Sequence, residues 1–437
     1  MQSPQWMTTA RVLRRAGFGA TGTQIDAVAG QDLSAYLDQV LAADPERDPG
    51  ALATPMPQWS APPPAPGRTA TRAARVQYNQ MLAEDAAQLS SWWVRRMVAV
   101  HQPLHEKLTL LWHNHFATSA AKVRVASYMA AQNQKLRTLS LGDFRTLAFA
   151  MLTDAAMLRW LDGQSNTAKA ANENLSREFM ELFALGHGNG YTEDDVRQGA
   201  RALTGWTIDR TGSTRLVAKR HDAAQKTLLG VTGNLGADDY CDIVLAQPNS
   251  ARYVAGRLWQ QLATDAGPSP AALDRAVTAY GSQRNLAALT KSILTDPEFL
   301  GSTNTVVSTP VEWLVGVLRS LNVAVDSGAN AKTVVTALKT LGQQPFYPPD
   351  VGGWPHGQPW LSTATAGVRL RTATALAKAA DLSTIDQASV RDRLDATGFL
   401  IGVGAWTDRS AAALAPLAKD PPQLLAAAVN TPEYLTS

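Results

Sequence analysis

Two histidines stand one residue apart in the apolar stretch LTLLWHNHFATSAAK, residues 108–122. His113 and His115 are separated only by Asn114. Histidine is the commonest metal ligand in proteins and the usual proton shuttle near neutral pH. The pair therefore points to metal binding or acid–base chemistry. The alternative is that each imidazole is a hydrogen-bonded residue of an apolar core.

The spacing of these histidines decides whether they can bind the same ion. Each residue advances about 100° around a helix, so His113 and His115 would point roughly 200° apart. In an unbroken helix they could not ligate one metal. The rings could converge only if the helix ended near Trp112, and the sequence leaves both possibilities open.

A second group of candidate residues lies in NENLSREFMELFALG, residues 172–186. Helical spacing places Arg177, Glu178 and Glu181 within about 100° of one another. Carboxylates held close together have separated pKa values, which suits an acid–base pair, and they also suit a metal ion. Arg177 could orient an anionic substrate. The alternative is a solvated helix face with an Arg177–Glu181 ion pair.

The remaining candidates fall on expected loops. His221 and Asp222 are adjacent in KRHDAAQKTLLG and suit a metal pair, a base with its orienting carboxylate, or plain surface. Trp354 and Trp360 lie in the proline- and glycine-rich segment 342–362. Their rings could stack on sugars or peptides, or they could anchor this long loop to a core.

Several common site motifs are absent from the sequence. It contains no HExxH, no GxSxG and no zinc-type cysteine pairing. The glycine-rich pieces GHGNGY and GVTGNLG lack the lysine and the strand-to-helix context of phosphate-binding loops, so they indicate turns. Cys241 is the only cysteine, which excludes an intrachain disulfide but fits both a reducing compartment and export.

Composition limits the classes of partner. The 437 residues are 45% hydrophobic and 18% charged, with a net charge of +3, so we expect no nucleic-acid binding, which normally needs a clustered basic patch. No apolar run approaches the ~18 residues of a membrane span. The first residues lack the basic-then-apolar plan of a signal peptide, and the compartment stays open between cytoplasm and export with a partner.

The elements that would position these residues are mainly helices. Alanine, leucine, arginine and glutamine are plentiful, which favours a mainly α, multi-helix orthogonal bundle with a small β-hairpin and two long Pro/Gly-rich loops. The hairpin is expected in TRLVAKRHDAAQKTLLGVTGN. We expect four parts: an N-terminal helical segment (1–54), a proline-rich connector (55–70), a core helical unit with the candidate site (71–235), and a C-terminal helical unit (236–437) with the Trp-rich loop 342–362.

Six segments occur together in a characteristic order: LRRAGFGAT, PLHEKLTLLWHNHFATS, NENLSREFMELFALGHGNGYTEDDVRQGARALTGWTI, RHDAAQKTLLG, PVEWLVGVLRSL and VGGWPHGQPWLST. With them the chain resembles the bacterial domain of unknown function 1800, from about Arg11 to the C-terminus. The resemblance implies a predominantly helical architecture and no settled reaction. It also implies a genomic neighbour, the domain of unknown function 1501 family, which resembles sulfatase-like proteins.

The resemblance also marks characteristic polar and aromatic positions. Carried over by position, they are His113, His115, Arg177, Glu178, Glu181, Tyr191, Thr192, Asp195, Trp206, His221, Asp222, Lys226, Trp354, Pro355 and Trp360.

Two functions follow as hypotheses. The first is a metal-assisted hydrolase acting on a polymer or an anionic substrate, with a divalent metal as the suspected cofactor. Its metal ligands would come from His113, His115, Glu178, Glu181, His221 and Asp222; its catalytic groups would be Glu178, Glu181, Arg177 and His221; and its substrate would contact Trp206, Trp354 and Trp360. The second is a non-enzymatic helical adaptor for the sulfatase-like neighbour or for a surface polysaccharide. The first requires the imidazoles near position 114 and the acids near position 180 to face a common hollow.

Overall fold

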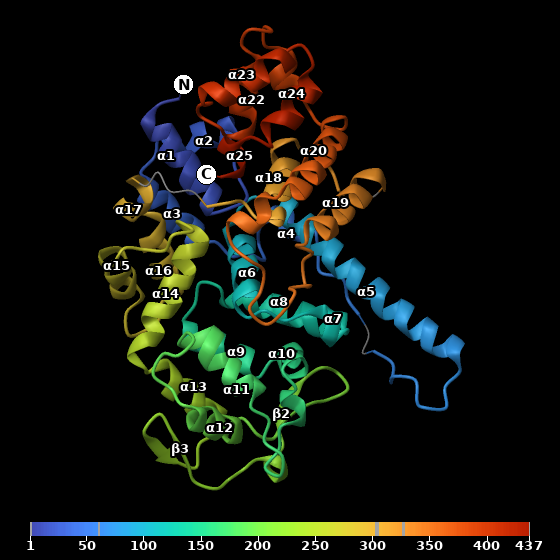
Figure 1. Ribbon diagram of the computed structural model, residues 1–437, viewed down its shortest axis with the longest axis vertical. Helices are drawn as coiled ribbons and strands as arrows, with labels where there is room; N and C mark the ends of the chain where they lie inside the picture. Colours follow the sequence, from blue (N-terminus) through green and yellow to red (C-terminus); the bar gives the residue numbers. More distant parts are fainter. Residues whose placement is uncertain (1, 60–61, 302–305, 326–327, 437) are drawn as a thin grey trace.

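The computed structural model describes residues 2–59, 62–301, 306–325 and 328–436. The predicted mainly α fold is confirmed, because the described residues are mostly helical and form only two small antiparallel sheets (Figure 1). In the described part of the chain, no helix combines the length and the apolar character that crossing a membrane requires.

The N-terminal segment begins with short helices whose ends are set by local capping. The side chains of Ser3, Thr21, Asp32 and Asp48 each accept a hydrogen bond from a main-chain N–H of the following helix, which satisfies donors that the first turn leaves free. The helices are α1 (Pro4–Arg15), α2 (Gly22–Ala29), α3 (Leu33–Leu41) and α4 (Pro49–Ala53).

The long helix α5 (Arg72–Ala99) follows the proline-rich connector, whose described residues form no helix or strand. In Figure 1 the N-terminal half of α5 extends away from the other helices. Its C-terminal half is buried through residues such as Trp92, Trp93 and Met97.

After α5 come α6 (Leu104–His115), α7 (Ala120–Val123), α8 (Ala126–Leu139), α9 (Phe144–Leu152), α10 (Ala155–Trp160), the 3-10 turn η1 (Gly163–Ser165), α11 (Asn174–Glu178), the π-helical turn η2 (Phe179–Ala184) and α12 (Glu193–Ala202).

The small β structure differs in detail from the predicted single hairpin. Strand β1 (Trp206–Ile208) pairs with β2 (Thr214–Leu216), and β3 (Lys226–Leu228) pairs with β4 (Val231–Gly233), both antiparallel. The predicted segment therefore contains one complete hairpin, β3–β4. The same segment begins with β2, which pairs with the preceding strand β1 and not with β3. The 3-10 turn η3 (Ala218–Arg220) separates the two sheets.

The C-terminal half is again helical. Most of its helices begin at a proline or a capping side chain; for example, Thr309 and Glu312 form a reciprocal capping box at the start of α18. The elements are α13 (Ala237–Leu245), α14 (Pro248–Leu262), α15 (Pro270–Tyr280), α16 (Leu286–Leu294), α17 (Pro297–Gly301), α18 (Pro310–Ser320), α19 (Gly328–Leu341), η4 (Gln358–Leu361), α20 (Thr363–Ala377), α21 (Ser383–Asp386), α22 (Arg393–Ile401), α23 (Asp408–Leu414), η5 (Ala415–Leu417), α24 (Pro421–Ala428) and α25 (Pro432–Leu435).

Two large apolar cores meet at α6. The first contains residues of α6, α9, α13, α14 and α16, and the second contains residues of α5, α18, α20 and α24. Helix α6 contributes Leu108 and Leu111 to the first core and Leu110 to the second. The predicted boundary between the core unit (71–235) and the C-terminal unit (236–437) stays a prediction. Residues on both sides of it contribute to the first core.

Candidate functional site

The histidine helix is unbroken. Helix α6 continues through His115, so the two imidazoles enter different surroundings. The ring of His113 lies between aromatic rings, with centroid distances of 5.5 Å to Trp93, 5.4 Å to Phe346 and 5.5 Å to Trp354. Its Nε2 atom is buried and has no hydrogen-bond partner among the described residues.

His115 faces the opposite way, toward the π-helical turn. Its Nε2 atom lies 2.9 Å from the carbonyl oxygen of Phe183. Burial lowers the pKa of His113 to about 3, and burial, with the nearby charge of Arg257, lowers the pKa of His115 to about 3. Both imidazoles are therefore neutral at physiological pH, as expected for core histidines.

The carboxylate helix forms an ion-pair network at the surface. Arg177 donates to Glu193 at 2.8 Å through each of two nitrogens, to Glu173 at 3.0 Å and to Glu181 at 3.5 Å. The second oxygen of Glu181 lies 3.1 Å from Nδ1 of His187. Arg177 is thus engaged by three carboxylates of its own chain.

Glu178 lies beside this network. Burial, followed by the neighbouring charge of Glu181, raises its pKa above the usual value. A π-helical turn begins immediately after it, because the N–H of Leu185 donates to the carbonyl oxygen of Met180 at 2.9 Å. Single π turns inside helices are frequent at functional sites. This one moves Glu181 away from the helix face that it would share with Glu178 in a regular helix.

No hydrogen bond or ion pair among the described residues joins the imidazoles of α6 to the acids of α11 and η2. The histidine and carboxylate helices do meet, but His115 bonds the main chain at Phe183, while Glu181 pairs with Arg177 and His187. Within the described ranges, no three His, Cys, Asp or Glu side chains come together in a way that could hold a metal ion. The predicted six-residue metal set is therefore not assembled, because α6 stays helical and its imidazoles diverge.

His221 and Asp222 occupy a third, separate place. Nδ1 of His221 lies 3.0 Å from the carbonyl oxygen of Thr204, and Asp222 accepts a 2.7 Å hydrogen bond from Arg201. This bond from Arg201 lowers the pKa of Asp222. Lys226 donates to main-chain carbonyls in the same loop. These contacts fasten the loop before β3 to α12.

The tryptophans of the second long loop are buried anchors. Trp354 is 2% exposed and Trp360 is 5% exposed, and both pack with Val307 in a small apolar cluster. The indole N–H of Trp360 donates to the carbonyl oxygen of Pro355 at 2.9 Å. Neither ring offers a free face for a polymer, whereas Trp206 in β1 is half-buried.

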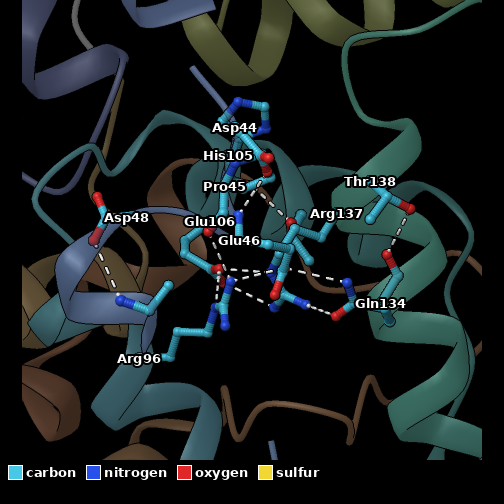
Figure 2. Close-up of polar contacts among 12 residues, drawn as sticks. Asp44, Pro45, Glu46, Asp48, Arg96, His105, Glu106, Gln134, Arg137 and Thr138 are labelled. Carbon is cyan, nitrogen blue, oxygen red and sulfur yellow. Dashed lines mark hydrogen bonds and ion pairs between the residues drawn. The ribbon is translucent and has the colours of Figure 1, made fainter. Parts of the chain in front are cut away.

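One buried charge cluster has no counterpart among the predictions from the sequence. Glu106 accepts hydrogen bonds from Arg96 at 2.7 Å and from Arg137 at 2.6 and 3.0 Å, with all three side chains buried (Figure 2). Trp93 donates to the same carboxylate at 2.8 Å. Burial alone would raise the pKa of Glu106, but Arg137 and Arg96 together lower it to about 2. The cluster ties α5, α6 and α8 together.

Arg96 extends this cluster to the N-terminal segment. Its Nη2 atom donates to the carboxylate of Glu46 at 2.9 Å and to the carbonyl oxygen of Pro45 at 3.1 Å (Figure 2). Nearby, the carboxylate of Asp48 accepts the main-chain N–H groups of His101 and Gln102 at 3.0 and 2.8 Å. The C-terminal end of α5 is therefore held from two sides.

A cavity of about 600 Å³ opens beside this fixed helix end, next to α2 and α18. Arg95 and Arg319 line it, and none of its described lining residues is acidic. The Nε atom of Arg95 is buried and finds no partner in the described part of the chain. We name this space the arginine cavity; its lining residues are Gln24, Thr54, Arg95, Val98, Ala99, Val100, His101, Leu318, Arg319, Asn322, Val323, Ala324 and Val325.

A second, much smaller crevice also gathers polar residues. It has about 30 Å³, against about 600 Å³ for the arginine cavity. Asn114, Asp265, Glu312 and His356 line it. Glu312 pairs with Lys107 and caps α18, so its carboxylate is already engaged. The arginine cavity is therefore the better candidate for an organic ligand.

The cavity residues carried only weak signals in the sequence. Arg95 and Arg96 stand together in WWVRRMVAV, where an aromatic and aliphatic run suggests burial. Arg319 lies near the end of PVEWLVGVLRSL, one of the segments that carry the resemblance. Their meeting depends on tertiary structure, because α18 and α5 are far apart in the chain.

Comparison with known proteins supports the family suggested by these segments. A family model described as "Protein of unknown function (DUF1800)" matches residues 11–436, which is nearly the whole chain. No curated protein and no solved structure matches the chain. The matched range contains the histidine helix, the carboxylate helix and the arginine cavity. The chain therefore belongs to the DUF1800 family of proteins of unknown function.

Proposed function

We propose that the chain is a non-enzymatic binding protein that takes a small organic anion into the arginine cavity. The observation that carries the proposal is the pair of guanidinium groups, Arg95 and Arg319, in a cavity whose described lining contains no acid. Ligand sites are typically concave spaces of several hundred Å³ with a few polar groups among apolar walls. The volume of about 600 Å³ fits that range.

Arg319 is fixed in position but keeps donors free. Its Nη1 atom donates to the carbonyl oxygens of Met97, Val98 and Val100 at 3.1, 2.9 and 2.6 Å. No hydrogen bond joins its Nε and Nη2 atoms to another described residue. A guanidinium held in this way is preorganised for a carboxylate, which matches its planar fork of donors.

The charge of the site favours an anion. Burial lowers the pKa of Arg319 to about 10, while the charge of Asp48 opposes that shift, so the side chain stays protonated at neutral pH. Asp48 itself accepts the N–H groups of Gly50, Ala51, His101 and Gln102. Arg95 forms no ion pair with a described acidic residue, and its buried Nε atom has no hydrogen-bond partner among the described residues. A bound anion would offset the cost of burying these two cations.

The same reasoning weighs against the hydrolase hypothesis. Its candidate ligands lie in three separate places. Apart from Glu178, each is hydrogen-bonded within the chain or lies among aromatic rings. The proposed anion binder shares only the absence of catalysis with the helical adaptor that the sequence predicted. The sulfatase-like partner and the surface polysaccharide stay predictions of the resemblance.

Isothermal titration calorimetry on the full chain tests the proposal with 4-bromobenzoate and its neutral isostere 4-bromobenzamide. We expect the carboxylate to bind and the amide to bind at least tenfold more weakly, because charge-assisted hydrogen bonds contribute about 1.5–3 kcal/mol. Arg95→Gln should weaken carboxylate binding by a similar factor.

The matched control is Arg210→Gln, which removes the same charge from an exposed arginine outside the cavity lining. It should bind 4-bromobenzoate as the unaltered chain does. Equal affinity for the acid and the amide would overturn the proposal, as would an Arg95→Gln chain that binds normally.

A further inference from the structure

The arginine cavity does not end at Arg319. A second hollow of about 240 Å³ shares Gln24, His101 and Arg319 with it, so the two spaces adjoin at these residues. We name this second space the apolar annex. Its other lining residues are Leu13, Gly19, Ala20, Ala27, Val28, Tyr36, Gln102 and Pro103.

Charge is distributed unequally between the two spaces. Arg95 lines only the arginine cavity, and Arg319 lies where the two spaces join. Apart from Arg319 and His101, the described lining of the annex carries no charged or titratable group except the phenol of Tyr36. Burial raises the pKa of that phenol, so Tyr36 is neutral and presents a mostly apolar ring.

The walls of the annex are suited to a hydrocarbon chain. Val28 and Leu13 are buried side chains of α2 and α1, and Ala27 and Ala20 leave space because their side chains are small. Apolar surface removed from water on such walls stabilises a complex in proportion to its area. Arginine donors at one end and an apolar wall at the other suit a ligand with the same two parts.

We propose that the ligand is an amphipathic carboxylate, with its head group at Arg95 and Arg319 and an unbranched apolar tail in the annex. This inference rests on the proposed function and adds the chemical class of the ligand. It predicts that affinity depends on tail length as well as on charge.

Calorimetry with acetate, butyrate, hexanoate and octanoate tests the inference on the full chain. We expect affinity to rise about fourfold for each added methylene until the annex is filled, and then to level off. Ala27→Trp places a large ring in the annex at an exposed helix position. In that variant the dependence on tail length should flatten, while 4-bromobenzoate affinity changes by less than about threefold.

The matched control is Thr23→Trp, which adds the same ring at an exposed position of α2 outside both linings. It should keep the full dependence on tail length. If affinity is independent of tail length while 4-bromobenzoate still requires Arg95, the amphipathic ligand is wrong and the anion site stands. If no carboxylate binds at all, both proposals are wrong.

Discussion

Two adjacent arginines of α5 have opposite environments. Arg96 is buried and donates to Glu106, to Glu46 and to the carbonyl oxygen of Pro45. Arg95 has a buried Nε atom with no partner among the described residues and lines an open cavity. The charge of Arg96 is therefore offset by acidic groups of the protein, whereas the charge of Arg95 is available to a bound anion.

The difference bears on how function can be recognised in this chain. Charges that are paired inside the protein, as Glu106 is with Arg96 and Arg137, offset one another and hold helices together. The same holds for Arg177, whose guanidinium contacts three carboxylates. A positive group without a counter-charge at a cavity wall is the more informative observation.

The largest effect is expected from Glu106→Gln. It removes the one negative charge between two buried arginines, and an uncompensated buried charge costs about 3–5 kcal/mol. The free energy of unfolding, measured by urea titration, should fall by that amount. Glu84→Gln, at an exposed position of the same helix as Arg96, is the control and should change it by less than about 0.5 kcal/mol. A loss below about 1 kcal/mol for Glu106→Gln would contradict the role of the cluster.

Acid should destabilise the protein in two steps. His113 and His115 have pKa values lowered to about 3, whereas unfolded histidine titrates near 6.5, so the unfolded chain binds more protons in between. Stability is therefore lost as pH falls from about 6.5 toward 3. Glu106 has a pKa lowered to about 2, so its contribution is present above the unfolded pKa of about 4.3 and is lost as pH falls toward 2.

Urea titrations from pH 7 to pH 3 check these two steps. His113→Phe should make the decline between pH 6 and pH 4 shallower, because one site that cannot be protonated in the fold is removed. An unchanged slope in that variant would mean that His113 is charged in the folded protein.

Replacing the adjacent arginines, Arg95 and Arg96, should have intermediate effects that differ between stability and binding. Arg96→Gln should lower the free energy of unfolding by about 3 kcal/mol, since Glu106 loses one of its two buried counter-charges. Arg95→Gln should change it by less than about 0.5 kcal/mol, while weakening the binding of 4-bromobenzoate. Thermal or urea unfolding beside calorimetry measures both properties. Equal losses of unfolding free energy in the two variants would contradict the difference between Arg95 and Arg96.

The smallest effect is expected at the surface network. Arg177 is half-exposed, and exposed ion pairs contribute about 0–1 kcal/mol each. Arg177→Gln should therefore lower the free energy of unfolding by no more than about 1 kcal/mol and leave 4-bromobenzoate affinity unchanged. A loss of binding would place the carboxylate helix back in the functional site.

Local features of the fold could be predicted because they depend on neighbouring residues. The capping box at the start of α12, for example, joins Thr192 and Asp195, which are only three positions apart. Gly186, the first residue of GHGNGY, adopts a φ of 89°, in a segment for which the sequence predicted a turn. The π-helical turn at Phe179–Ala184 could not be predicted, because it shifts a hydrogen-bond register without changing the apolar pattern.

Contacts between distant segments account for what the sequence did not reveal. Glu106 and Arg137 are 31 positions apart, and neither periodicity nor capping connects them. The meeting of α5 with α18 at the arginine cavity has the same origin. Histidines and acids mark the candidate site in the sequence because those residue types carry familiar chemistry, whereas the charged residues that line the cavity are arginines.

The most direct test is a crystal structure of the full chain with 4-bromobenzoate, in which anomalous scattering locates the bromine atom. The account predicts the carboxylate within hydrogen-bond distance of Arg95 and Arg319, inside the arginine cavity. Bromine found only at other places on the protein, with the cavity empty at saturating ligand, would contradict it.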